Sequence, residues 1–316
     1  MAGWVVPGGD GEANLVVQLR RCRDIAFLLN MESHAGWPEL NAATLRIKGS
    51  GDNWVGVLEV MTRSDCSGGT WVQLEAPAGV PMRCWWSTLT EAQHEKGEIS
   101  WPNRVVIVLP EVFGVNAWVR SVADRLAADG LPALAIPLFS RTAPDLDLGY
   151  SDADLALGRR HKEATTADQI LSDVAAAITW LRARHPHASI GVVGFCFGGH
   201  AALLAATLAE VEVSVDFYGA GVSRMCPGGG PPSLNRLTQV QGRLIALCGT
   251  ADPLIPSEDQ VAIEAALHQA DPSGQRLRYC AFEGADHGFM CEARSSFHPQ
   301  AAAQGWTLLC DALALS

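Results

Sequence analysis

Hydrophobic residues from about residue 104 onward form short continuous runs, separated by segments in which they recur every three to four positions. The runs RVVIVLP, LPALAIP, ASIGVVG, VEVSVDFYG, GRLIALCG and RLRYCAF have the length of buried strands. The segments between them predict helices over residues 116–129, 163–184 and 257–269, one after ASIGVVG and one from residue 299. A polar loop rich in Asp and Arg is expected up to about residue 162. Strands that are apolar throughout indicate a mostly parallel central sheet with helices on both faces, an α/β fold.

Residues 1–68 fit this alternation poorly. ANLVVQLRRCRDIAFLLNM (13–31) predicts a helix, whereas WVGVLEVMTR (54–63) and TWVQLEAP (70–77) predict strands. We therefore expect an N-terminal extension of uncertain structure over residues 1–68 and an α/β domain over residues 69–316. Three roles fit the extension: a cap over the active site, an interface between copies of the chain, or cover for an edge strand. The sequence favours none of them.

Composition narrows the class of protein. The 316 residues are 48% hydrophobic and 18% charged, as in an ordinary globular protein. A net charge of −11 argues against a nucleic-acid partner, because binding phosphates requires clustered Lys and Arg. No apolar run reaches membrane-spanning length and no secretion signal begins the chain, so we expect a cytoplasmic protein without membrane contact. The nine cysteines occur without CxxC spacing, which favours reduced thiols, with neither metal nor cofactor.

The segment GFCFGG (194–199) joins a predicted strand to a predicted helix and has the spacing of a nucleophile elbow. Cys196 occupies the position of the nucleophile. The glycines at 194 and 198 fit the sharp turn, and the N-terminus of the following helix favours negative charge. Taken alone, the motif fits equally well a small buried cysteine in a glycine-rich connection.

An elbow nucleophile requires a base and a carboxylate that orients it, in the chain order nucleophile, acid, histidine. Asp252 directly follows the strand GRLIALCG, and His287 follows RLRYCAF before the last helix. His268 and His298 fall within or beside predicted helices and are weaker candidates. Glu111 ends the strand RVVIVLP next to apolar residues, where a carboxylate is costly without a partner. A surface glutamate is the alternative interpretation.

The motifs LPEVFGVN, GFCFGG, GTADPLIP and GADHGFM, in this order, resemble the dienelactone hydrolase (carboxymethylenebutenolidase) family of the α/β-hydrolase fold. The resemblance covers about residues 69–315. It implies that Cys196 is the nucleophile, His287 the base and Asp252 the group that orients the base. It also implies that Glu111 accepts the thiol proton when a substrate carboxylate arrives.

The resemblance further implies an oxyanion hole formed by the backbone N–H groups of Val112 and Phe197. Members that act on dienelactone hold its carboxylate with two arginines, one before the long helix and one shortly after the catalytic histidine. At the second of these positions this chain has Cys291 nearby and an arginine three residues later. The candidate substrate-binding residues are therefore Arg159, Arg160, Arg294 and Phe113.

We thus expect a hydrolase that cleaves small esters or enol lactones through a Cys-His-Asp triad and an acyl-thioenzyme. The first alternative is a carboxylesterase or thioesterase with other substrates, differing in the loops 138–162 and 221–240. The second is a non-catalytic binding module, which predicts the loss of at least one of the four catalytic candidates. A redox sensor at Cys196 would require a second thiol close by. The expected partner is a small-molecule substrate, and a homo-oligomer is compatible with the sequence.

Overall fold

The computed structural model describes residues 15–19, 44–50, 53–59, 68–88 and 104–314, and the chain divides into two compact units, Met1–Ser67 and Gly68–Ser316. In the first unit β1 (Leu15–Leu19), β2 (Thr44–Ser50) and β3 (Asn53–Glu59) form an antiparallel sheet in the order β1-β3-β2. The prediction of a helix is wrong for residues 15–19. These residues pair with β3 from Leu15 opposite Leu58 to Leu19 opposite Trp54, so backbone pairing in a sheet overrides the helical periodicity.

The second unit contains an eight-stranded sheet in the order β11-β10-β9-β8-β6-β7-β5-β4. Its strands are β4 (Thr70–Ala76), β5 (Val80–Ser87), β6 (Arg104–Leu109), β7 (Ala133–Ala135), β8 (Ser189–Phe195), β9 (Val211–Phe217), β10 (Arg243–Gly249) and β11 (Leu277–Phe282). Every pair from β7 to β11 is parallel, whereas β4, β5 and β7 pair antiparallel. The predicted, mostly parallel sheet is confirmed.

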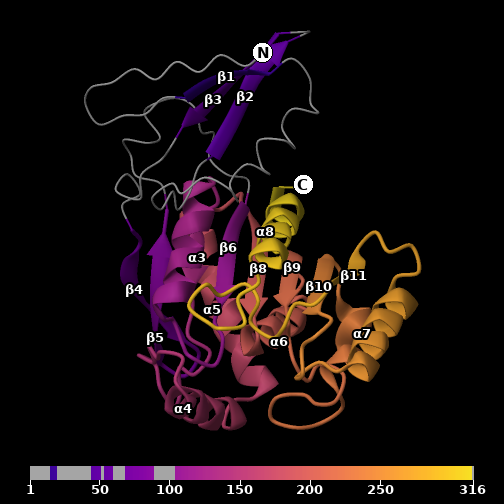
Figure 1. Cartoon of the computed structure of the whole chain (residues 1–316). Coiled ribbons are helices and arrows are strands. Elements are labelled where there is room, and N and C mark those ends of the chain that lie inside the picture. The colour runs from indigo at the N-terminus through magenta and orange to yellow at the C-terminus, as the bar shows by residue number, and fades with distance from the viewer. Residues whose placement is uncertain (1–14, 20–43, 51–52, 60–67, 89–103, 315–316) are drawn as a thin grey trace. The chain divides into compact units, whose positions relative to one another are not determined.

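Side chains of one strand alternate between two hydrophobic layers. Val106 and Val108 of β6 pack in the layer that contains buried residues of α3 (Ala117–Ala128) and α8 (Pro299–Ala314). Val105 and Ile107 pack in the opposite layer, with buried residues of α5 (Ala167–Arg184) and α6 (Phe197–Ala205). Helices therefore cover both faces of the sheet (Figure 1). The helix α7 (Ser257–Ala270) packs beside β11.

The polar loop expected up to residue 162 is instead partly helical. Residues Asp152–Glu163 form α4, which begins at Ser151 with a capping box to Asp154. Acidic residues lie in its first turn and basic residues in its last turn, which suits the helix dipole. The long helix predicted from residue 163 consequently begins later, because Thr166 caps α5 with a second capping box. A short 3-10 helix, η2 (Ser233–Gln239), lies within the loop 221–240.

Strand order reverses between β6 and β8. The chain leaves β6 for β7 on one side and returns to β8 on the other side of β6. In such sheets the crevice at the carboxyl ends of the two strands is the usual binding site. Every helix among the described residues is too short or too polar to span a bilayer. The seven cysteines that the structure describes are free thiols.

Candidate active site

Cys196 lies at the turn between β8 and α6, where the strand order reverses. Its backbone has φ 56° and ψ −116°, a conformation that costs free energy for any residue with a side chain. Two hydrogen bonds hold the turn: the N–H of Cys196 donates to the Phe217 carbonyl at 3.0 Å, and the N–H of His200 donates to the Cys196 carbonyl at 3.1 Å. A Cβ at Gly198 would strike the carbonyls of residues 109 and 110, so only glycine fits there. The thiol is half-buried at the start of α6.

His287 and Asp252 come from the loops after β11 and β10, at the same edge of the parallel sheet as Cys196. Nδ1 of His287 lies 2.8 Å from Oδ2 of Asp252, and both residues are buried. The other oxygen of Asp252 accepts a hydrogen bond from the Leu254 N–H at 2.7 Å. Both carboxylate oxygens are thus held, which fixes the orientation of the imidazole. Nε2 of His287 is buried, and the Cys196 side chain acts on the imidazole both by its charge and by hydrogen bonding.

The charge of His287 depends on its neighbours. Burial lowers the pKa of His287, but the negative charge of Cys196 and the hydrogen bond to Asp252 oppose burial and raise the pKa to about 10. His287 is therefore an imidazolium at neutral pH when a thiolate lies beside it. An imidazole between a carboxylate and a thiol is the arrangement from which a base can take and return a proton.

Glu111, at the end of β6, forms an ion pair with Arg294. Oε1 of Glu111 accepts a hydrogen bond from Nη1 of Arg294 at 2.7 Å, and Glu111 is 1% exposed. Burial raises the pKa of Glu111, and the positive charges of Arg294 and His287 oppose this rise. The guanidinium lies against Gly288, at φ 87°, where a side chain would collide with it. Cys196 is, after Glu111, the negative group that most raises the pKa of Arg294, so the guanidinium is coupled electrostatically to both residues.

The candidate oxyanion donors flank the thiol. Residues 111–114 form a turn in which the N–H of Gly114 donates to the Glu111 carbonyl at 3.4 Å. Neither the N–H of Val112 nor that of Phe197 donates a hydrogen bond among the residues that the structure describes. Both amides are therefore available to an oxygen atom of a ligand. Phe113, within this turn, is buried, and its ring packs against that of Tyr150 with 4.7 Å between the centroids.

Among the described residues, the other sequence candidates form no hydrogen bond or ion pair with the four catalytic candidates. Arg159 and Arg160 are exposed on α4, and neither guanidinium has an ion pair within the described part of the chain. His268 lies in the last turn of α7, and Nδ1 of His298 accepts a hydrogen bond from the Ala301 N–H at the start of α8. The residues described contain no cluster of three or more His, Cys, Asp or Glu able to hold a metal ion.

Sequence reasoning missed a polar cluster of half-buried and buried side chains that acts electrostatically on Glu111. The Tyr150 hydroxyl accepts hydrogen bonds from Nδ2 of Asn116 at 3.1 Å and from Sγ of Cys291 at 3.2 Å. The ring of Tyr218 lies edge-on to His287, with 5.1 Å between ring centroids. Tyr218 directly follows the strand VEVSVDF, and this position was the signal by which it could have been found.

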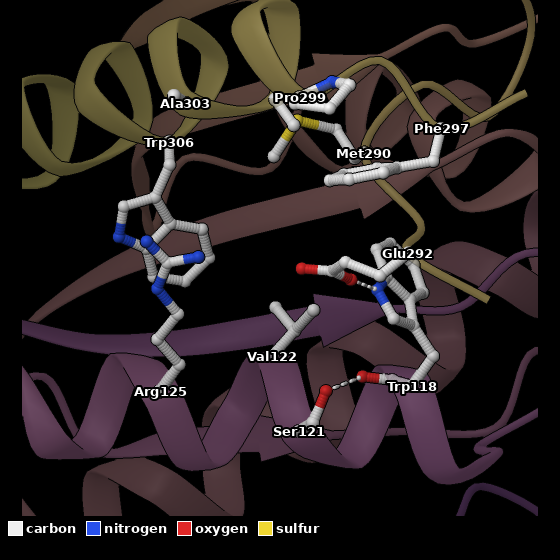
Figure 2. A pocket seen from close by; sticks show the side chains of 11 residues that line it. Trp118, Ser121, Val122, Arg125, Met290, Glu292, Phe297, Pro299, Ala303 and Trp306 are labelled. Atoms are coloured by element: carbon white, nitrogen blue, oxygen red, sulfur yellow. Dashed lines mark hydrogen bonds between the residues drawn. The ribbon is translucent and has the colours of Figure 1, made fainter. Parts of the chain in front are cut away.

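A pocket of about 220 Å³ lies between α3 and the segment that leads into α8 (Figure 2). Within it, Nε1 of Trp118 donates to the Glu292 carboxylate at 2.7 Å, and the Arg125 guanidinium stacks 3.7 Å from the Trp306 ring. None of the four catalytic candidates lines it. The lining residues are Trp118, Ser121, Val122, Arg125, Met290, Glu292, Phe297, Pro299, Ala302, Ala303 and Trp306.

Comparison with known proteins shows which protein family the chain belongs to. A sequence model of the dienelactone hydrolase family matches residues 92–315. A protein of Synechocystis sp. named "Putative carboxymethylenebutenolidase" is 38% identical over 64% of this chain and 82% of its own. The carboxymethylenebutenolidase of Pseudomonas putida is 27% identical over 64% of this chain and 81% of its own.

The fold agrees with the sequence match. The crystal structure of a "Putative Dienelactone Hydrolase" from Klebsiella pneumoniae superposes with a TM-score of 0.66 at 24% identity, covering 78% of this chain and 99% of that one. The predicted α/β-hydrolase fold and the predicted resemblance are confirmed. The chain belongs to the dienelactone hydrolase family and is a hydrolase that acts on ester or lactone bonds.

Proposed function

We propose that the enzyme hydrolyses small esters or enol lactones with Cys196 as nucleophile, His287 as base and Asp252 as the group that orients the base. The observation that carries the proposal is the position of the His287 imidazole between a carboxylate and a thiol. Nδ1 lies 2.8 Å from the buried Asp252 carboxylate, and the Cys196 side chain acts on the imidazole by charge and by hydrogen bonding. All the groups that this mechanism uses belong to residues 69–316.

In the proposed reaction the Cys196 thiolate attacks the carbonyl carbon and a C–S bond forms. The carbonyl oxygen becomes an oxyanion that accepts hydrogen bonds from the N–H groups of Val112 and Phe197. The C–O bond to the leaving group then breaks, and the His287 imidazolium gives its proton to the departing oxygen. The product of this half-reaction is a thioester on Cys196, with His287 neutral.

Water completes the cycle. Neutral His287 takes a proton from a water molecule as its oxygen attacks the thioester carbonyl, and collapse of the tetrahedral intermediate releases the acid and restores the thiolate beside the imidazolium. Asp252 keeps Nδ1 protonated throughout, so that Nε2 always faces the reacting atoms. The proton that His287 takes from water replaces the one it gave to the leaving group, the other proton of the water molecule leaves with the product acid, and the enzyme returns to its starting state.

We further propose that Arg294 binds a negatively charged group of the substrate. Of the three candidate arginines it is the one that interacts with both Glu111 and Cys196, whereas Arg159 and Arg160 are exposed on α4. A second candidate function is an esterase for uncharged substrates. The observation in its favour is Cys291, which is buried near the position where the resemblance expects a second arginine, and which adds no positive charge.

The test compares wild type, Cys196→Ala and the matched control Cys310→Ala, which removes a half-buried thiol elsewhere on the chain. Each is assayed with p-nitrophenyl acetate, with dienelactone and with the dienelactone methyl ester. We expect Cys196→Ala to abolish turnover and Cys310→Ala to retain it. Activity in Cys196→Ala equal to wild type would refute the nucleophile. A preference of wild type for the methyl ester over dienelactone would favour the esterase for uncharged substrates.

A further inference from the structure

Tyr218 stands out among the residues that the mechanism does not use. It follows β9, is fully buried, and has φ 44°, in the left-handed region that residues other than glycine rarely adopt. Its N–H donates to the Leu247 carbonyl at 2.8 Å, which ties the strained backbone to β10. Its ring lies edge-on to His287 and to Phe289, each with 5.1 Å between centroids. These contacts fix the position of the Tyr218 side chain beside His287.

The hydroxyl of Tyr218 is buried and makes no hydrogen bond to the described residues. Burial of an unpaired hydroxyl is unfavourable, and such groups in native proteins usually have a functional cause. The ionisable groups that act on this hydroxyl are Glu111, Cys291, Arg294 and Cys196. Burial and the negative neighbours raise the pKa of Tyr218, so the hydroxyl remains a donor. It is a donor without an acceptor, and the buried Glu111 carboxylate is the charged group that acts on it most strongly.

The ion pair of Glu111 explains why the hydroxyl is unpaired at rest. Oε1 of Glu111 is occupied by Arg294, whose guanidinium also interacts with Cys196. A negatively charged group that arrives at the thiol therefore competes with Glu111 for the same guanidinium. When Arg294 turns to that group, Glu111 loses its ion pair while it remains buried, and a buried carboxylate without a donor is strongly unfavourable.

We propose that Tyr218 is a positioning residue that donates a hydrogen bond to Glu111 when an anionic substrate draws Arg294 away from that carboxylate. This inference rests on the proposed function in one respect, the binding of a substrate anion by Arg294. A hydrogen bond to an ionised acceptor is about twice as strong as one between neutral groups. Tyr218 thereby lowers the cost of releasing Arg294, and it favours anionic over neutral ligands at Cys196.

Alkylation of Cys196 tests the proposal without any ester substrate. Iodoacetate and iodoacetamide have almost the same shape and differ in charge. With each, the thiolate displaces iodide, so that a C–S bond forms and a C–I bond breaks. The second-order rate at Cys196 is followed by mass spectrometry of its peptide in wild type, in Tyr218→Phe and in the matched control Tyr279→Phe, whose hydroxyl bonds instead to Gln260 at 3.0 Å.

We expect Tyr218→Phe to lower the ratio of the iodoacetate rate to the iodoacetamide rate by about tenfold, the factor for one charged hydrogen bond. The iodoacetamide rate should change less than twofold, and Tyr279→Phe should keep the wild-type ratio. The melting temperature of Tyr218→Phe should not fall, because the substitution removes an unpaired buried hydroxyl. An unchanged ratio, or an equal loss of rate with both reagents, would overturn the proposal.

Two further measurements keep the test decisive. In a Glu111→Gln background, Tyr218→Phe should leave the ratio unchanged, and a persistent effect would mean that Tyr218 acts on another group. Should Tyr218→Phe fail to fold, two alkylated forms of the wild-type protein are compared instead. One carries the anionic carboxymethyl group on Cys196 and the other the neutral carbamidomethyl group, and the NMR signal of Tyr218, labelled at Cζ, is recorded in each. Identical Tyr218 signals in the two forms would overturn the proposal. Because no ester is hydrolysed here, loss of the proposed hydrolase function would leave these outcomes interpretable.

Discussion

Replacing Arg294 by methionine should destabilise the enzyme in a way that depends on pH. Met preserves an unbranched side chain of similar length but leaves Glu111, which is 1% exposed, without its ion pair. Removal of one partner from a buried ion pair costs about 3–5 kcal/mol. The Arg294 side chain is 21% exposed, and Tyr218 offers Glu111 another donor, so we expect the lower end, about 3 kcal/mol. For a domain of this size that corresponds to a fall in melting temperature of about 6–12 °C.

The sign of the pH dependence follows from Glu111. Its pKa is raised in the folded enzyme above the ordinary value of 4.5, and loss of Arg294 raises it further. Below the unfolded-state pKa the carboxyl is protonated in both states, so the substitution costs little there. As pH rises through the pKa of Glu111 in folded Arg294→Met, the carboxylate becomes charged without a partner. Above that pKa the variant shows its full loss of stability.

Thermal unfolding of wild type and Arg294→Met, followed by circular dichroism from about pH 4.5 to pH 8, measures this dependence. The two melting temperatures should lie close together at the acidic end and separate toward pH 8. In the double variant Arg294→Met/Glu111→Gln no buried carboxylate is left without a partner. Its melting temperature should therefore differ from that of wild type at pH 8 much less than the melting temperature of Arg294→Met does. A difference in melting temperature that is the same at every pH, or absent at pH 8, would refute the reasoning.

Three other substitutions test the site. Cys196→Ser should lower the pKa of His287 well below about 10, because it removes the negative charge that opposes burial; an NMR titration of the imidazole measures the change. Asp252→Asn should lower kcat/KM by about 10²–10⁴, because the amide no longer fixes the tautomer of His287; steady-state kinetics with p-nitrophenyl acetate will show whether this occurs. Gly198→Ala should unfold the protein at a lower temperature than wild type, because its Cβ would approach the Pro110 carbonyl to 2.5 Å; a melting curve compares the two.

The fold and the four catalytic candidates could be predicted because their signals are local. A strand buried on both faces is an uninterrupted apolar run, and the residue that ends it lies at the carboxyl edge of the sheet. Glu111 and Cys196 follow β6 and β8 in this way, Asp252 lies in the loop after β10, and His287 in the loop after β11. The alternation of side chains between layers, as along β6, then follows from the two-residue period of a strand.

The helix α4 was missed because its main signal is capping rather than periodicity. Gly158 is its only buried residue, so no apolar stripe marks it. The charges interpreted as a polar loop are those of a helix: Asp152 and Asp154 near its N-terminus, and Arg160 among the basic residues of its last turn. The strand β1 was missed for the opposite reason. Its apolar residues satisfy a helical period, and only pairing with β3 decides between the two structures.

The polar cluster around Glu111 lies beyond sequence reasoning because its members meet only in the folded chain. Tyr150 follows α3 and β7, Tyr218 follows β9, and Cys291 follows β11, yet all three act electrostatically on one another or on Glu111. Once the fold was known, two features of Tyr218 indicated a functional role. The hydroxyl of Tyr218 has no partner, and its backbone lies in a costly conformation.

The charges at the site set different requirements for neutral and for anionic substrates. In the resting site each positive group already faces a negative one: Arg294 faces Glu111, and His287 lies between Asp252 and Cys196. A neutral ester can bind and react at Cys196 while the ion pair of Arg294 with Glu111 remains intact. An anionic substrate must instead take Arg294 from Glu111, and the buried carboxylate must then find a proton or another donor. The ratio of the rates with anionic and neutral substrates should therefore depend on the groups around Glu111 more than on the proposed triad. Variants of the proposed triad should lower the rates with both kinds of substrate.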